Sequence, residues 1–366
     1  MVVVITGASS GVGRAAAIAF ARAGARLVLA ARSASSLEPV AETCRGLGAE
    51  VRVVVADVTD PAALDPVADA FGRVDVWVHT AAVMAYGRFE DVPADVFNQV
   101  VETDLIGAAN VARVALRRFR AQGRGVLIYG GSLLGTVVTP YTSSYVTSKW
   151  GLRALVRALR LETRDAPDIH VCLVAPGSVD TPIYRTAANF AGRYGQPPPP
   201  IDSPEKVAAA IVRCARRPRG VVTVGLANRI IQFGFVATPP LYDLLVGPLM
   251  RRGGLSTETV APHEGNVFRP YSQAGQTART ASASASPWRS PAPAAAGRRD
   301  GSMKFGPNAS SAASSGSTSR VLPAPVDAIS ARIRSRLNAA IGAITTRWSA
   351  PAARSAPAPS RTPPSM

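Results

Sequence analysis

Short, uninterrupted apolar runs alternate along the chain with longer segments in which apolar residues recur at helical spacing. Residues 2–5 are all β-branched, a pattern typical of a buried strand. Comparable runs predict further strands at 26–30, 51–56, 74–80, 125–130, 169–175 and 221–225, with helices at 14–24, 36–46, 60–71, 94–122, 141–164 and 203–217. This alternation predicts an α/β fold: a doubly wound parallel sheet of about seven strands with helices on both faces. Ligands of such a sheet bind beyond the carboxyl ends of its strands.

A glycine-rich turn joins the first predicted strand to the first predicted helix. Residues 6–13 read Thr-Gly-Ala-Ser-Ser-Gly-Val-Gly, and an alanine-rich segment follows that ends at Gly24. Glycines let the backbone approach a pyrophosphate closely, and a helix N-terminus adds N–H groups and the positive end of its dipole. The spacing is G-x-x-x-G-x-G, which differs from the G-x-G-x-x-G dinucleotide fingerprint. The turn predicts a phosphate site; a tight turn without a ligand is the alternative.

Tyr145 and Lys149 are a candidate acid–base pair. Both lie in the predicted helix 141–164, where residues i and i+4 share a face. A fixed ammonium beside a phenol lowers the phenol pKa from its usual value of about 10. The pair therefore predicts a proton donor or acceptor that works near neutral pH. Tyr141 is a competing phenol, but its i+4 residue is Tyr145 rather than a lysine.

Together these motifs resemble those of the short-chain dehydrogenase/reductase family. Residues 6–13 are similar to its cofactor-binding turn, and Ser132, Tyr145 and Lys149 stand at its catalytic spacing. Residues 175–182 resemble the family's Pro-Gly segment, which meets the nicotinamide, and Asp57-Val58 resembles the pair that contacts the adenine. The resemblance covers residues 1–226 and implies a Rossmann-like catalytic domain there. An apolar extension or flap at 227–270 and a basic tail at 271–366 would follow it.

The resemblance implies hydride transfer between a nicotinamide and a carbonyl or secondary alcohol carbon. Tyr145 would then exchange the proton with the substrate oxygen, Ser132 would hydrogen-bond that oxygen, and Lys149 would lower the tyrosine pKa and bond the nicotinamide ribose. A homo-oligomer, dimer or tetramer, is also implied. The implied cofactor-binding residues are Gly7, Ser9, Ser10, Gly11, Val12, Gly13, Arg32, Asp57, Val58, Ala81, Tyr145, Lys149, Pro176, Gly177, Val179 and Thr181.

Two positions depart from the family pattern. Residues 79–82 read His-Thr-Ala-Ala where the family usually has Asn-Asn-Ala-Gly. We expect His79 to be an interior histidine with local hydrogen bonds rather than a cofactor or metal ligand. Asp104 stands where the family usually has an asparagine, whose backbone carbonyl holds a water near the lysine. Asp104 retains that carbonyl and is therefore counted among the catalytic residues, while its carboxylate adds a charge close to Lys149.

The end of the second predicted strand bears on which cofactor is used. No acidic residue follows that strand, where an NAD enzyme would bond the ribose 2′-hydroxyl. Arg32 is instead placed to meet a 2′-phosphate. The sequence therefore favours NADP(H) over NAD(H), and a solvated surface arginine is the alternative.

The net charge of +17 is concentrated near the end of the chain. Residues 271–366 hold 12 Arg and Lys against 2 Asp and Glu, whereas residues 1–270 hold 29 and 22. The low-complexity composition of 271–366 predicts disorder, apart from a basic amphipathic helix that could form at 326–348. No base-reading motif accompanies the basic residues, so no nucleic-acid partner is expected.

The cysteines and the first residues of the chain bear on the cellular compartment in which the protein works. The three cysteines are widely spaced without a CxxC pair, so no metal site is expected and a reducing, cytoplasmic location is favoured. The first strand begins at residue 2, which argues against a signal peptide. The apolar stretch 230–250 is interrupted by prolines and Asp243, which argues against a membrane-spanning helix. Residues 230–252 are expected to form a flap on the pocket or on a partner subunit, with peripheral membrane contact as the alternative.

A long segment after the Pro-Gly motif, residues 182–200, is expected to form a lid that includes Tyr184, Phe190 and Tyr194. Met84, Tyr86, Leu133, Leu134 and Val138 are expected to add an apolar wall.

The predicted function is therefore an NADP(H)-dependent oxidoreductase that acts on a hydrophobic small-molecule carbonyl or alcohol. One alternative is a catalytically impaired regulatory or scaffold protein, which the changes at 79–82 and at Asp104 favour. The other is a lipid or sterol reductase that works at a membrane surface through residues 230–252.

Overall fold

The structure is a computed structural model, and it describes residues 1–225 and 227–270. The predictions for the segment 271–366, including the helix at 326–348, lie outside the described residues. In the part of the chain that the structure describes, no helix is both long and apolar enough to cross a membrane.

The central element is a seven-stranded parallel sheet in the order β12-β7-β6-β4-β1-β2-β3. This order confirms the predicted doubly wound α/β fold, since the strands run outward in both directions from β1 and β4. Strands β1, β4 and β6 are almost entirely buried, as their apolar runs require. The strands are β1 (Val2–Thr6), β2 (Arg26–Ala31), β3 (Val51–Val55), β4 (Val76–His79), β6 (Gly125–Gly130), β7 (Ile169–Pro176) and β12 (Val221–Val224).

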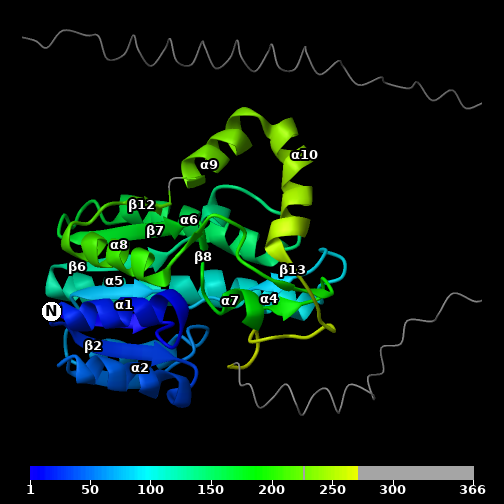
Figure 1. Cartoon of the computed structure of the whole chain (residues 1–366). Coiled ribbons are helices and arrows are strands. Elements are labelled where there is room, and N and C mark those ends of the chain that lie inside the picture. Colours follow the sequence, from blue (N-terminus) through cyan, green and yellow to red (C-terminus); the bar gives the residue numbers. More distant parts are fainter. Residues whose placement is uncertain (226, 271–366) are drawn as a thin grey trace, which may run out of the picture. The chain divides into compact units, whose positions relative to one another are not determined.

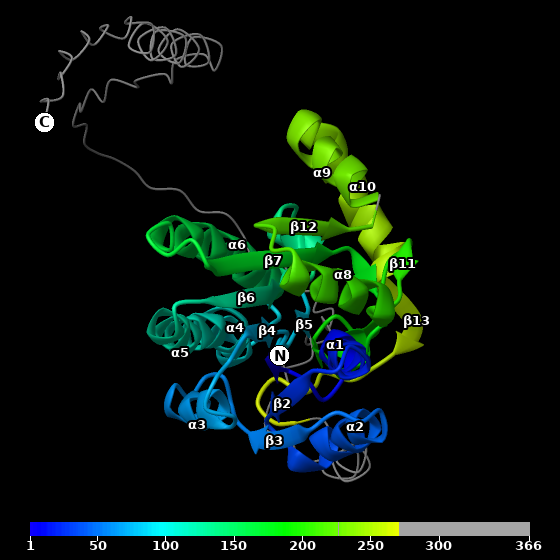
Figure 2. The same cartoon turned by 90° about the vertical axis from the view of Figure 1, so that its left-hand side faces the viewer.

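Helices cover both faces of this sheet (Figures 1 and 2). One apolar core lies under α1, α2 and α8, and a second lies under α3, α5 and α6. The alanine-rich sequence of α1 lets it approach the sheet closely, and its buried residues include Ala15, Ala16 and Ala17. The covering helices are α1 (Gly11–Arg22), α2 (Ala34–Gly46), α3 (Asp65–Asp69), α5 (Gly107–Gln122), α6 (Ser143–Glu162) and α8 (Pro204–Arg216).

The region predicted as one helix over 94–122 contains a break. It consists of α4 (Ala94–Val101), a π-helical turn (Glu102–Ile106) and α5. A π-turn inserts an extra residue into the helical ladder and is often found at functional sites. Here it accompanies the burial of Thr103 and Asp104.

Further elements, most of them short, cluster beyond the carboxyl ends of the strands. Three two-stranded sheets join β5 to β9, β8 to β11, and β10 to β13. Most of these strands have only two or three residues, which is too short for a periodic signal. The additional elements are β5 (Ala85–Tyr86), 3-10 turn Leu133–Gly135, β8 (Ser178–Val179), α7 (Ile183–Thr186), β9 (Ala188–Asn189), β10 (Arg193–Gly195), β11 (Ile201–Asp202), α9 (Ala227–Ala237), α10 (Pro239–Leu249), π-turn Met250–Gly254 and β13 (Leu255–Thr259).

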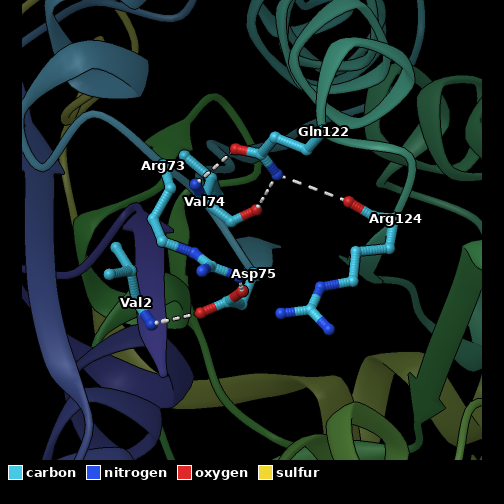
Figure 3. Close-up of polar contacts among 6 residues, drawn as sticks. All are labelled: Val2, Arg73, Val74, Asp75, Gln122 and Arg124. Atoms are coloured by element: carbon cyan, nitrogen blue, oxygen red, sulfur yellow. Dashed lines mark hydrogen bonds and ion pairs between the residues drawn. The ribbon is translucent and has the colours of Figure 1, made fainter.

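A polar network lies at the other end of the sheet, where the central strands β1 and β4 begin (Figure 3). Asp75 accepts a hydrogen bond of 2.8 Å from the Val2 N–H and pairs with Arg73. Gln122 accepts from the Val74 N–H at 2.9 Å and donates to the Val74 carbonyl at 2.7 Å. The network therefore ties the last turn of α5 and the start of β1 to the entry of β4. Partial burial opposes ionisation of Asp75, but the Val2 and Arg73 interactions outweigh it and hold its pKa below the usual value.

We expect Asp75→Asn to lower the free energy of unfolding by about 1 kcal/mol at neutral pH, because the variant loses the charge that Val2 and Arg73 stabilise. A depressed carboxyl pKa contributes stability above the unfolded value of about 3.9 and loses it as the pH falls through the folded value. The difference from the wild type should therefore shrink in acid. Urea unfolding at about pH 7 and about pH 3 measures it. The exposed Glu90→Gln variant is the control, and an equal deficit at both pH values would contradict this account.

Candidate active site

One cavity of about 930 Å³ brings most of the predicted site residues together. Its walls come from the segments that follow β1, β2, β4, β6 and β7, so it lies beyond the carboxyl ends of the strands. Asp104 is the exception, because it lies behind Lys149 with no exposed surface. The predicted residues that line the cavity are Gly7, Ser9, Ser10, Gly11, Val12, Gly13, Arg32, Asp57, Val58, Ala81, Ser132, Tyr145, Lys149, Pro176, Gly177, Val179 and Thr181.

The glycine turn packs so closely that side chains are excluded. Gly7 has a φ of 81°, a left-handed conformation that favours glycine. A Cβ at Gly13 would lie 2.1 Å from the Gly7 carbonyl oxygen and 2.6 Å from Thr80 Oγ1. Ser10 is the N-cap of α1 but makes no side-chain capping bond, so the first N–H groups of the helix remain for a ligand. These residues fit the pyrophosphate of a dinucleotide.

The Pro-Gly segment forms the neighbouring wall. A Cβ at Gly11 would lie 3.1 Å from Thr181 Cγ2, so the glycine turn and this segment are in contact. Asn228 of α9 completes this wall. Its side-chain amide donates a hydrogen bond to the Val224 carbonyl. A Cβ at Gly177 would lie 2.4 Å from Asn228 Oδ1, so the two residues are in close contact. Asn228 also lines the cavity. No motif marks it in the sequence, because its contacts arise only when α9 meets the end of β7.

Ser132 and Tyr145 lie next to each other in the cavity wall. Ser132 follows β6 and caps a 3-10 turn, where its Oγ accepts a hydrogen bond of 3.1 Å from the Leu134 N–H. Tyr145 is buried in the first turn of α6. Burial raises the pKa of the Tyr145 phenol, the Asp104 charge raises it further, and a hydrogen bond with Ser132 opposes the shift. The phenol is therefore protonated at neutral pH, which differs from the expectation that Lys149 makes it easy to ionise.

Burial is the main reason for this difference, and an ion pair that engages Lys149 adds to it. Lys149 Nζ lies 3.3 Å from Asp104 Oδ2, and both side chains are buried. The other carboxylate oxygen of Asp104 accepts a hydrogen bond of 2.7 Å from the Val83 N–H. Burial raises the pKa of Asp104, while Lys149 and the Val83 bond oppose that shift. Asp104 thus balances the lysine charge directly through its carboxylate, which the sequence analysis placed close to Lys149, and the role of its backbone carbonyl stays a prediction.

His79 ends β4 beside this ion pair. Its Nδ1 lies 2.9 Å from Thr6 Oγ1, and its ring packs edge-on against Tyr129 at 5.6 Å. Burial lowers the pKa of His79 to about 3, and the Lys149 charge acts in the same direction, so the imidazole is neutral. The Nε2 atom is buried and has no hydrogen-bond partner among the described residues. The expected interior histidine with a local hydrogen bond is therefore found, although only one ring nitrogen is satisfied.

Arg32 is engaged by a distant part of the chain. Its two terminal nitrogens donate to the carbonyls of Val267 at 3.0 Å and Asn266 at 2.6 Å. The Asn266 N–H in turn donates to Thr186 at 2.8 Å, and Val267 is fully buried in a small apolar cluster. Arg32 is therefore not a solvated surface side chain. Each terminal nitrogen of a guanidinium carries a second N–H, so donors remain for an anion in the cavity.

Asn110 supports the expected adenine end of the cavity. Its Nδ2 donates to the Val58 carbonyl at 3.1 Å, which ties the loop after β3 to α5. A Cβ at Gly107 would lie 2.6 Å from Val58 Cγ2, so the loop and helix are in close contact. Asp57 closes the loop on itself by accepting hydrogen bonds from the N–H and hydroxyl of Thr59 at 2.9 and 2.8 Å. Sequence reasoning missed Asn110, since it lies outside the recognised motifs.

The apolar wall is largely as expected. Met84, Tyr86, Leu133 and Leu134 line the cavity, whereas Val138 does not. Val138 is exposed, and its carbonyl accepts a hydrogen bond of 2.7 Å from the Tyr242 hydroxyl.

Of the three aromatic residues in the predicted lid, only Tyr184 lines the cavity. Tyr184 lines the cavity with Pro182 and residues 198–200. Phe190 instead packs on the small apolar cluster that contains Val267, and Tyr194 lies 6.1 Å from the His263 ring. Tyr141 has a left-handed backbone just before α6 and is not part of the cavity wall, so it does not compete for the phenol role.

Comparison with known proteins identifies the family. A family model described as short chain dehydrogenase matches residues 1–190. An uncharacterised oxidoreductase, YxnA, of Bacillus subtilis is 32% identical over 258 residues, covering 68% of this chain and 72% of that protein. The chain belongs to the short-chain dehydrogenase/reductase family of oxidoreductases.

Individual relatives differ in how much of their length is matched. Dehydrogenase/reductase SDR family member 7B of Rattus norvegicus is 32% identical over 205 residues, covering 53% of this chain and 63% of that protein. The alcohol dehydrogenase of the archaeon Thermococcus sibiricus, solved in complex with 5-hydroxy-NADP, is a similar structure. It shares 31% identity with a TM-score of 0.53 and covers 61% of this chain and 94% of its own.

We expect Asp104→Asn to lower the pKa of Tyr145, because the variant removes a negative charge that disfavours the phenolate. An amide oxygen can still accept the Val83 hydrogen bond, so the fold should be retained. The measurement is an NMR titration of isotope-labelled tyrosine, with Tyr145 assigned by its loss in Tyr145→Phe. Glu102→Gln in the same π-turn is the matched control. A Tyr145 titration that stays in place or moves to higher pH would refute the proposed charge balance.

Proposed function

We propose that this chain is an NADP(H)-dependent oxidoreductase that acts on the carbonyl or secondary alcohol group of a hydrophobic small molecule. The observation that carries the proposal is the single cavity in which the glycine turn lies with Ser132, Tyr145 and Lys149. Membership of the short-chain dehydrogenase/reductase family supports the reaction class. The apolar wall of Met84, Tyr86 and Leu134 supports a hydrophobic substrate.

In the reductive direction, one hydride and one proton are added across the carbonyl bond. When bound, the nicotinamide supplies the hydride to the carbonyl carbon. The Tyr145 phenol gives its proton to the substrate oxygen as negative charge develops there, and the Ser132 hydroxyl donates a hydrogen bond to the same oxygen. Tyr145 is left as a phenolate and regains a proton from solvent. Burial keeps the phenol protonated at neutral pH, which is the form that can give a proton to the substrate oxygen.

Lys149 and Asp104 hold this arrangement in place. Lys149 Nζ lies 5.1 Å from the centre of the Tyr145 ring, which is close enough to stabilise the phenolate that forms during reduction. Asp104 fixes the position of the lysine from behind, through the buried ion pair. We assign Asp104 a positioning role, since it does not reach the cavity.

Three features support NADP(H) over NAD(H). Arg32 lines the cavity at the end of β2, and no acidic residue stands there to bond a ribose 2′-hydroxyl. Ser33 and Ser36, at the N-terminus of α2, line the cavity beside it and add hydroxyl groups. A guanidinium and a helix N-terminus together favour the extra phosphate of NADP.

We expect Tyr145→Phe to reduce turnover by about 10²- to 10⁴-fold, because the proton donor is removed. NADPH binding should change little, as measured by quenching or enhancement of nicotinamide fluorescence. The assay is NADPH consumption with a panel of apolar aldehydes and ketones, and Tyr141→Phe is the control. Retained turnover would disprove the assignment. A wild-type chain that binds NADPH but reduces no carbonyl would instead favour a regulatory or scaffold protein.

We expect Arg32→Ala to raise the KM for NADPH by about tenfold or more while changing the KM for NADH little, because only NADPH carries the 2′-phosphate. Arg45→Ala, an exposed change on α2, is the control. Steady-state kinetics with both cofactors measure the difference. A clear preference of the wild type for NADH, or an equal rise in both constants, would contradict NADP specificity.

A further inference from the structure

Helices α9 and α10 form an arch that leads away from the sheet and its covering helices, which we call the body, after β12 and returns to the body at β13 (Figures 1 and 2). The arch carries unusually exposed apolar side chains. Ile230, Phe233 and Val236 on α9 are 74%, 71% and 70% exposed, and Leu244 on α10 is 69% exposed. Isolated exposed apolar residues are normal, but a group of them on one small element marks a contact surface.

One side of the arch is fixed to the body. The Phe235 ring lies 6.3 Å from the Trp150 ring of α6 and 5.1 Å from the Tyr242 ring of α10. The Tyr242 hydroxyl donates to the Val138 carbonyl at 2.7 Å. On a helix, Ile230 and Phe233 lie on the side opposite Phe235, and Leu244 lies opposite Tyr242. These three residues therefore lie on the sides of their helices away from the Phe235–Tyr242 contact and are exposed in the described chain, and we call them the outer apolar face of the arch.

The same arch forms part of the cavity wall. Leu241, Leu245 and Leu249 of α10 line the cavity, yet they are themselves largely exposed. They recur at helical spacing, so they make an apolar stripe along α10. The wall of the cavity thus continues onto the surface of the arch. Thr238, Tyr242 and Arg252 also line the cavity beside this stripe, so the apolar route into the cavity runs along the leucines of α10.

The distribution of charge indicates what covers the outer face. Arg229 stands at the start of α9, and Arg251 and Arg252 follow α10, so exposed cations mark both ends of the arch. Between them, Asp243 is the only charged residue. Cations at the base with apolar side chains beyond them match the anionic headgroups and acyl boundary of a bilayer. A symmetric contact between two arches would offer these arginines only the Asp243 carboxylate of the second copy.

We propose that the arch docks this protein on the surface of an anionic lipid bilayer. Ile230, Phe233 and Leu244 enter the acyl boundary, and the arginines at the base meet the headgroups. Each helix has 11 residues, about half the length that spans a bilayer, so the contact is interfacial. We further infer that the cavity receives an apolar substrate from the bilayer, and this second part rests on the proposed function.

The test is vesicle flotation of the full chain, with vesicles of phosphatidylcholine alone and mixed with phosphatidylglycerol. The triple variant Ile230→Ser/Phe233→Ser/Leu244→Ser should bind the mixed vesicles at least about tenfold more weakly than the wild type. The matched control is Val55→Ser/Phe89→Ser/Leu161→Ser, which removes exposed apolar side chains elsewhere and should bind as the wild type. Circular dichroism checks that both fold. Equal binding by wild type and arch variant would overturn the proposal, because the vesicle contact would then lie elsewhere on the chain.

Two further variants separate the parts of the proposal. Arg251→Gln/Arg252→Gln should lose the preference for phosphatidylglycerol, and an unchanged preference would contradict the headgroup contact. Tyr145→Phe should bind vesicles as the wild type does, so a failure of the proposed chemistry remains distinct from a failure of docking.

Analytical ultracentrifugation tests whether a second copy of the chain covers the arch instead. If the wild type is a dimer that does not bind vesicles, and the arch variant is a monomer, the arch is a contact between two copies.

Supply of substrate from the bilayer is tested separately, by steady-state kinetics. With a long-chain ketone held in vesicles, the arch variant should show a raised KM and an unchanged kcat, whereas a short, water-soluble ketone should give unchanged constants. The contrast holds because docking affects access and leaves Ser132, Tyr145 and Lys149 untouched. A KM for the long-chain ketone that does not change would refute delivery through the arch.

Discussion

A buried ion pair between Lys149 and Asp104 ties the catalytic helix to the π-turn beside it. Two charges can be kept out of water only when they compensate each other and their remaining atoms are bonded, so the surrounding segments must hold their positions. The Val83 N–H satisfies the second oxygen of Asp104 and thereby fixes the loop after β4 as well. Burial keeps His79 neutral and Tyr145 protonated, and the charges of the pair act in the same direction: Lys149 lowers the pKa of His79 further, and Asp104 raises the pKa of Tyr145 further.

The cavity is completed by residues that lie far along the chain from the cofactor turn. The family model ends at residue 190, yet Asn228, residues of α10 and Asn266 all belong to the cavity wall. Arg32 makes this dependence explicit, because its partner Val267 lies 235 positions away. The family match therefore lies in the first 190 residues, whereas part of the cavity wall comes from the extension.

The extension also gives the arch two distinct sides. The Phe235, Tyr242 and Trp150 contacts hold its inner side against α6, which leaves the outer apolar side exposed. The leucine stripe of α10 belongs both to the cavity wall and to the exposed surface. The proposed docking and the proposed substrate entry would therefore use the same element.

The resemblance to the short-chain dehydrogenase/reductase family implied that Ser132 joins Tyr145 and Lys149. Local pattern determined the fold class, the seven main strands, the glycine turn and the placing of Tyr145 and Lys149 on one helical face. Each of these depends on information within a few residues: apolar periodicity, a backbone that only glycine tolerates, or i and i+4 on one helical face. The tertiary structure decided that Asp104 meets Lys149 through its carboxylate, that Arg32 is engaged by residues 266–267, that Asn228 closes the Pro-Gly wall, and that α9 and α10 form an arch. Those outcomes depend on contacts between segments distant in sequence, and no local period encodes which segments will meet.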